Sequence, residues 1–190
     1  MWPNLREDFR RACAQTTYRG VRKTLHVLTS PGFQAVWMHR VTRWLLHRRI
    51  PFFGAVIQRL TEVWTGISLP PEAAIGPGLL ILHFGGIILN SDAVLGKDCT
   101  LHHGVTIGNR VAGGPSPTIG DRAMIGVGAC VLGGIRLGDD VDVGANAVVL
   151  TSLPDGAVAA GIPARVVRLK RPRGGPPGPE GRSAIEESLR

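Results

Sequence analysis

The sequence predicts a mainly β protein, a parallel β-helix built from hexapeptide repeats and preceded by a short α-helical region. From Leu69 to Val149, aliphatic residues recur every six positions and are often followed by Gly. This period fits neither a strand, which repeats every two residues, nor a helix, which repeats about every 3.6 residues. The composition agrees, with 26 Gly but only 5% aromatic residues, because stacked coils need small residues at their turns and aliphatic side chains inside.

Residues 1–66 are predicted to be helical. Pro31 is a favourable first residue of a helix, and the apolar residues that follow it recur at helical spacing. Pro51 ends that helix, and residues 52–64 predict another. A further helix is expected within residues 4–28.

The repeat also predicts how the coils stack. Its period is interrupted by an eight-residue step from Ile81 to Leu89 and a twelve-residue step from Ile107 to Ile119. If three hexads form one coil, the coils begin at residues 75, 95, 119 and 137, about 4.8 Å apart. The third places of the second hexads then form one outward-facing column: His83, His103, Val127 and Ala145. We expect a groove there, with imidazoles at one end and irregular loops beside them.

The net charge of +8 is unevenly distributed. Residues 1–66 carry eleven Lys and Arg against three Asp and Glu, residues 67–164 four against eight, and residues 165–190 seven against three. An acidic middle between two basic ends does not favour nucleic acid as a partner. Residues 171–182 are rich in Pro and Gly, so a disordered tail is expected. We therefore predict three parts: helices in 1–66, the β-helix in 67–168 and the tail in 169–190.

The three cysteines, Cys13, Cys99 and Cys130, are far apart and form no CxxC pair. Neither a disulfide framework nor a cysteine zinc site is indicated. No apolar stretch is long enough for a membrane span, and the N-terminus lacks the apolar region of a signal peptide. A cytoplasmic protein is expected.

Several segments resemble serine O-acetyltransferases, members of the left-handed β-helix acyltransferase superfamily. The resemblance covers about residues 30–168 and includes PGFQAVWMHRVTRWLL, GPGLLILHFGG, VTIGN and AAGIPARVV. It implies a left-handed β-helix, a homotrimer with acetyl-CoA bound between neighbouring subunits, and acetyl transfer to a hydroxyl without a metal. Whether the trimers assemble further stays open.

The chain departs from the family's motifs at several positions. Leu82 precedes His83 where the family has an Asp, and Pro115 and Ser116 replace an Arg and a His. Residues 68–71 read SLPP where the family has DIHP. The groups that would recognise the charges of serine are therefore largely missing. We expect an acetyl-CoA-dependent O-acetyltransferase acting on a sugar of a cell-surface or exported glycan. The alternatives are a serine acetyltransferase and a non-catalytic solenoid scaffold.

His83 is the expected catalytic general base, since a neutral imidazole can take the proton of a hydroxyl as it attacks a thioester. Without the family's Asp, either Asp92 or a backbone carbonyl is expected to orient the ring. His103 is a second catalytic candidate, which either binds the acceptor or lies at the surface. A zinc site is disfavoured because the adjacent His102 and His103 should point to opposite faces.

The resemblance also places acetyl-CoA on the column. Its pantetheine would touch Val127 and Ala145, with Gly108 near the thioester. Thr151 and Arg165 would lie at the nucleotide end, where nearby basic residues suit phosphate groups.

The basic residues among 37–49, beside Trp37 and Trp44, have three interpretations. They form the solvated face of a helix, pack against another subunit, or dock on acidic lipid and make the protein membrane-peripheral. The histidines of the helical region, His26, His39 and His47, are expected at the surface.

Overall fold

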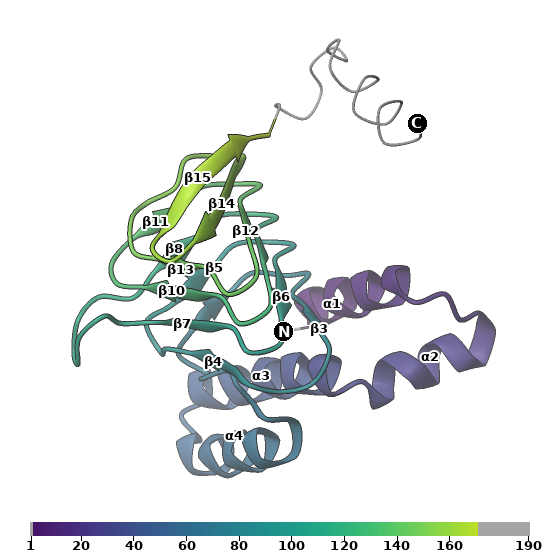
Figure 1. Cartoon of the computed structure of the whole chain (residues 1–190). Coiled ribbons are helices and arrows are strands. Elements are labelled where there is room, and N and C mark those ends of the chain that lie inside the picture. Colours follow the sequence, from purple (N-terminus) through teal and green to yellow (C-terminus); the bar gives the residue numbers. More distant parts are fainter. Residues whose placement is uncertain (1, 171–190) are drawn as a thin grey trace, which may run out of the picture.

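The computed structural model describes residues 2–170, which form four helices followed by a β-helix (Figure 1). The helices are α1 (Trp2–Gln15), α2 (Gly20–Thr29), α3 (Pro31–His47) and α4 (Pro51–Thr65). The mainly β fold with a helical region before it is therefore confirmed. The segment expected to be disordered, residues 171–182, lies outside the described residues.

The two helices predicted after Pro31 and Pro51 are confirmed as α3 and α4. Ser30 caps α3, because its Oγ accepts a hydrogen bond from the Phe33 N–H at 3.4 Å. The single helix expected within residues 4–28 is wrong, since α1 and α2 are separate. Between them, the Tyr18 N–H donates to Thr16 Oγ1 at 3.3 Å, a local bond that competes with continued helix.

The strands form three sheets that run along the β-helix. One contains β1 (Ile67–Ser68), β4 (Ile87–Leu89), β7 (Thr106–Gly108), β10 (Cys130–Leu132) and β13 (Val148–Val149). The second contains β2 (Ala74–Ile75), β5 (Val94–Leu95), β8 (Thr118–Ile119) and β11 (Arg136–Leu137). The third contains β3 (Leu80–Leu82), β6 (Thr100–His102), β9 (Met124–Ile125), β12 (Asp142–Val143), β14 (Ala157–Gly161) and β15 (Ala164–Leu169). All neighbours are parallel except the final pair, β14 and β15.

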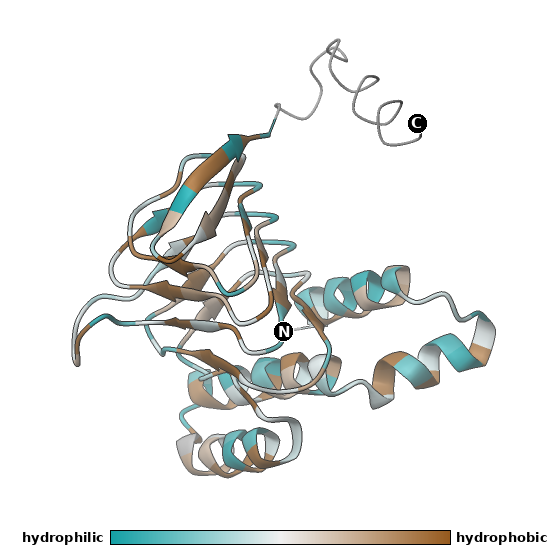
Figure 2. Ribbon diagram, in the orientation of Figure 1, coloured by the Kyte–Doolittle hydropathy of each residue, from teal (hydrophilic) through white to brown (hydrophobic). Residues whose placement is uncertain are grey.

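The register of the strands confirms the predicted coils. Ile75 pairs with Leu95, Leu95 pairs with Ile119, and Leu137 pairs with Ile119. These inward-facing residues are buried and belong to one continuous core. Figure 2 shows hydrophobic residues along the strands of the coils, whereas the helices have mixed hydropathy. Burial of the aliphatic positions thus fixes the coil length that the six-residue period predicts.

Close stacking of the coils explains the many glycines. A Cβ added at Gly96 would lie 2.6 Å from the carbonyl carbon of Gly120, and one at Gly120 would lie 2.7 Å from that of Gly138. No side chain fits between backbones that approach so closely.

The helices close the N-terminal end of the β-helix (Figure 1). Arg40 of α3 donates hydrogen bonds to the carbonyl oxygens of Ile75 and Gly76, each at 2.6 Å, and is only 4% exposed. Arg43 donates to the carbonyl oxygens of Pro71, Glu72 and Ala73. These two arginines bind open backbone groups of the first coil, so the solvated and lipid-docking interpretations do not hold for them.

His39 corrects another expectation, because it is buried and only 2% exposed. Its Nδ1 lies 3.3 Å from the Leu69 carbonyl oxygen, at the junction of α3 with the first coil. A histidine on the face of α3 that packs against the β-helix is core, although the residue that follows it, Arg40, is basic. None of the described helices has the length and apolar character needed to cross a membrane.

Candidate active site

The predicted neighbours His83 and His103 lie together at one edge of the β-helix. Leu82 pairs with His102 in the parallel register of β3 and β6, so the residues that follow them occupy equivalent places. The ring centroids of His83 and His103 are 5.5 Å apart, with the ring planes at 89°. Imidazoles from two coils therefore form one end of the column.

His83 lies in a turn that is longer than the corresponding turn of the next coil. Five residues lie between Leu82 and Ile88, whereas three lie between their partners, His102 and Thr106. His83 adopts a φ of 71°, in the left-handed region that few residues other than Gly occupy. The eight-residue step in the sequence thus produces an exposed turn with the candidate base at its start.

His102 joins the cluster. Its ring centroid is 6.2 Å from that of His83. The expectation that His102 and His103 point to opposite faces is therefore wrong, because His103 lies in the turn after β6, where the alternation of a strand no longer applies. Burial lowers the pKa of His102, and the charges that His83 and His103 would carry lower it further. His102 consequently favours its neutral form.

The cluster has no carboxylate partner in the part of the chain that the structure describes. The Nδ1 atoms of His102 and His103 are buried without a hydrogen-bond partner among these residues. Asp92 forms no hydrogen bond with His83 within residues 2–170; its own N–H donates to Asn90 Oδ1 at 3.1 Å. Within residues 2–170, no three His, Cys, Asp or Glu side chains are arranged to hold a metal ion. The His83 ring therefore contacts two imidazoles rather than a carboxylate.

The remainder of the column carries small side chains. The Gly128 N–H donates to the His103 carbonyl oxygen at 3.0 Å, and the Asn146 N–H donates to that of Val127 at 2.7 Å. Val127 is half-buried and Ala145 is exposed. Small side chains thus follow the imidazoles along this column.

The other predicted cofactor residues lie on different coils, and Gly108 and Thr151 lie at the ends of β7 and β13 that are opposite to the column. Gly108 is buried at the end of β7, where its carbonyl oxygen accepts from the Gly133 N–H at 2.8 Å. Thr151 follows β13, and Arg165 is in β15; both are exposed. Lys170, expected in the same basic cluster as Arg165, instead pairs with Asp142 at 2.6 Å.

The inserted loop of residues 109–117 leaves the coils after β7 (Figure 1). Ser116, which replaces the family's loop histidine, donates to Asn109 Oδ1 at 2.6 Å. Its hydroxyl therefore closes the loop on itself.

A cavity that no sequence motif predicts opens beside His83. It has a volume of about 240 Å³ and lies between α1, α2 and β3. Apart from His83, its polar lining residues come from the helical region: Gln15, Thr16, His26 and Ser30. They lie more than fifty positions before His83 in the sequence, and no local motif marks them.

Comparisons with known proteins give a consistent family. Residues 116–151 match the family described as bacterial transferase hexapeptide (six repeats), whose repeat fits the left-handed β-helix expected from the sequence. A serine acetyltransferase of Mycobacterium tuberculosis is 41% identical over 149 residues, which cover 77% of this chain. The chain spans 65% of that protein's length. A serine acetyltransferase of Helicobacter pylori is 41% identical over 147 residues, covering 76% of this chain and 86% of that protein.

Solved structures give the same result. Serine acetyltransferase from Brucella abortus in complex with coenzyme A has a TM-score of 0.83 at 29% identity, covering 90% of this chain and 69% of the other. The Neisseria gonorrhoeae serine acetyltransferase in complex with serine has a TM-score of 0.80 at 29% identity, covering 88% and 69%.

Proposed function

Because the chain belongs to the serine acetyltransferase family of bacterial hexapeptide transferases, we propose that it transfers an acetyl group from acetyl-CoA to the hydroxyl of serine. The proposed acceptor differs from the one expected from the sequence. The relatives described above are serine acetyltransferases, and one solved relative contains serine. They favour the serine acceptor, which was our alternative, over the glycan sugar that we first expected.

The observation that carries the proposal is the exposed His83 at the head of the column, in edge-to-face contact with His103. A neutral imidazole at His83 takes the proton of the serine hydroxyl while its oxygen attacks the thioester carbonyl. The carbon–sulfur bond of the thioester then breaks, and the protonated His83 returns the proton to the leaving thiolate of CoA. The neutral form favoured by His102 adds no competing positive charge beside the base.

The residues of the column fit acetyl-CoA. Val127 and Ala145 present small side chains along which the narrow pantetheine can lie, and Gly108 ends β7 at the other side of the same sheet. Thr151 and Arg165 are exposed, and the guanidinium of Arg165 suits the phosphates of the nucleotide end. The homotrimer expected from the resemblance would complete the groove with a neighbouring subunit.

This function agrees with the cytoplasmic location expected from the sequence. The membrane-peripheral alternative loses two of its basic residues, because Arg40 and Arg43 bind the first coil rather than facing outward.

The proposal is tested by release of free CoA from acetyl-CoA by the full-length protein with L-serine. Serine-dependent release, with O-acetylserine identified by mass spectrometry, supports it. Release with free sugars but not with serine would return the assignment to a sugar acceptor. No release with any acceptor, together with no binding of acetyl-CoA, would leave the scaffold.

A further inference from the structure

The cavity beside His83 is formed by both parts of the chain. Leu82 at the end of β3 and His83 after it form one side. From the helical region, Gln15, Thr16, His26 and Ser30 line the cavity. Because His83 belongs to this lining, a molecule in the cavity would reach the proposed base directly. The column with Val127 and Ala145 leads away from the same residue on the β-helix.

The size of the cavity limits what it can hold. Its volume of about 240 Å³ is below the roughly 300–1,000 Å³ of pockets for drug-sized ligands. It suits an amino acid or a single sugar ring rather than the long acetyl-CoA molecule. The cavity and the column therefore adjoin at His83.

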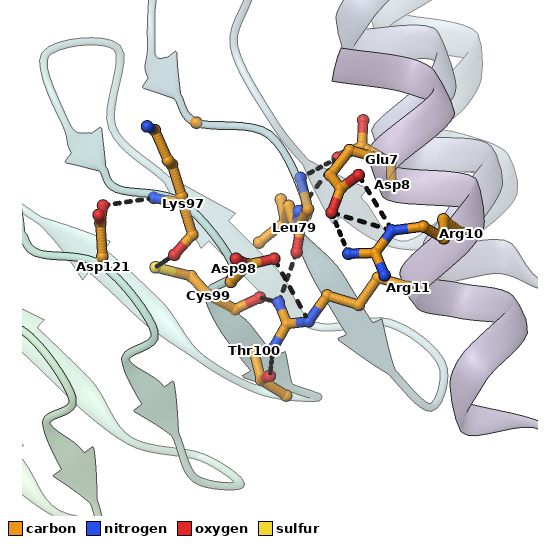
Figure 3. A network of polar contacts seen from close by, with 12 residues as sticks. Glu7, Asp8, Arg10, Arg11, Leu79, Lys97, Asp98, Cys99, Thr100 and Asp121 are labelled. Carbon is orange, nitrogen blue, oxygen red and sulfur yellow. Dashed lines mark hydrogen bonds and ion pairs between the residues drawn. The ribbon is translucent and has the colours of Figure 1, made fainter. Parts of the chain in front are cut away.

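The walls of the cavity carry no acidic, lysine or arginine side chain among the described residues. The charged residues of α1 nearest to β3 are already engaged (Figure 3). Asp8 accepts from the Gly78 and Leu79 N–H groups at 2.7 and 3.1 Å, and Arg11 donates to the Cys99 carbonyl oxygen at 2.6 Å.

An ionised ammonium or carboxylate gains little in such a cavity. Transfer of a charge from water is unfavourable unless an opposite charge or several hydrogen bonds compensate. Leu82 is half-buried beside the base and offers neither. The amide of Gln15 and the hydroxyls of Thr16 and Ser30 are instead suited to hydroxyl and amide groups.

We infer that this cavity is the acceptor site, and that it recognises the acceptor through neutral hydrogen bonds rather than through charge. The inference rests on the proposed acetyl transfer at His83 and concerns the acceptors that this site takes. They include uncharged hydroxyl compounds, such as a serine derivative without free ammonium and carboxylate groups or a small polyol.

The test compares L-serine with N-acetyl-L-serinamide, which has the same hydroxymethyl group but no charge. The structure predicts that the kcat/KM of CoA release with the neutral compound equals or exceeds that with L-serine. A tenfold or greater preference for L-serine would overturn the inference and leave the proposed function intact. Release with neither compound would overturn both.

Two substitutions at Leu82 sharpen the test. Leu82→Asp places a carboxylate beside the acceptor and should raise the kcat/KM ratio of L-serine to the neutral compound at least tenfold. Leu82→Asn has nearly the same shape without the charge and should keep that ratio within about twofold of the unaltered protein. Equal ratios for the two variants would contradict an acceptor site at this cavity.

A variant on the helical side covers the case in which Leu82 variants fail to fold. Thr16→Val removes one hydroxyl from the half-buried wall. It should raise the KM for either acceptor several-fold while the KM for acetyl-CoA stays unchanged. Unchanged acceptor KM values would overturn the assignment of the cavity.

Discussion

Asp8 of α1 and Arg40 of α3 form an ion pair that is buried between the helices and the first coil. Arg40 Nε lies 3.0 Å from Asp8 Oδ2, and the two side chains are 3% and 0% exposed. Each partner also binds backbone of the β-helix, Asp8 at the Gly78 N–H and Arg40 at the Ile75 carbonyl oxygen. The pair therefore joins two helices to the otherwise open end of the solenoid.

Removal of one partner should destabilise the protein strongly. Asp8→Ala leaves the charge of Arg40 buried without its counterion, which typically costs about 3–5 kcal/mol of the free energy of unfolding. Urea denaturation at pH 7 measures this loss. Glu7→Ala is a matched control, because Glu7 is the adjacent residue and its partner Arg10 is exposed. Similar destabilisation by the two variants would show that the buried pair is not what secures the helices.

The buried His39 should make stability depend on pH. Burial, aided by the charge of Arg40, lowers the pKa of His39 to about 4. In the unfolded chain His39 takes up a proton near its ordinary pKa of about 6.5, so the unfolded state binds more protons between these values. The free energy of unfolding should therefore fall as the pH drops from about 6.5 to about 4, by roughly 3 kcal/mol in total.

His39→Gln tests this dependence, because the amide keeps a donor for the Leu69 carbonyl oxygen and does not titrate. Urea denaturation at pH 7 and pH 5 should show a smaller loss in the variant than in the unaltered protein. His47→Gln changes an exposed histidine at the end of the same helix and should not alter the slope. Parallel pH profiles for all three proteins would contradict the role of His39.

The sequence predicts the coils better than the contacts that close them. Leu95 and Ile119 pair as the six-residue period requires, because each inward position accepts only an aliphatic side chain. No such pattern in the sequence predicts that Arg40 is buried. Its counterion, Asp8, lies 32 residues earlier, and a basic residue on an amphipathic helix usually faces solvent.

In the candidate site, too, the part formed by the coils is predictable from the sequence and the part formed with the helices is not. The repeat places His83 and His103 together because their spacing is set by the coil length. The sequence does not predict the cavity, because Thr16 and Leu82 come to line it together only through the packing of the helical region on β3. No repeat in the sequence predicts which residues of the helical region contact the coils.

His83 should be required for turnover. His83→Asn removes the imidazole, and Asn tolerates the left-handed φ of 71° at this position. The rate of CoA release should fall by a factor on the order of 10²–10⁴, while the KM for acetyl-CoA changes little. His47→Asn serves as the control, since His47 lies at the end of α3 and should keep full activity. An undiminished rate in His83→Asn would move the base elsewhere in the cluster.

The column should be blocked by a large side chain at Ala145. Ala145 is exposed on the coil whose backbone stacks on that of Val127. A phenyl ring in Ala145→Phe would fill the strip along which pantetheine is proposed to lie, so the KM for acetyl-CoA should rise at least tenfold. The KM for the acceptor should stay unchanged, because the acceptor cavity lies on the other side of His83, against α1 and α2.

Val21→Phe is the control for this substitution, since Val21 is 76% exposed on α2 and lies outside the column. It adds the same ring and should leave both KM values unchanged. Initial rates are measured at varied acetyl-CoA with saturating acceptor, and then at varied acceptor with saturating acetyl-CoA. The two series give the KM for acetyl-CoA and the KM for the acceptor separately. A rise in the acceptor KM alone for Ala145→Phe would mean that the donor does not follow the column. In that case the small side chains at Val127 and Ala145 would serve only the stacking of the coils.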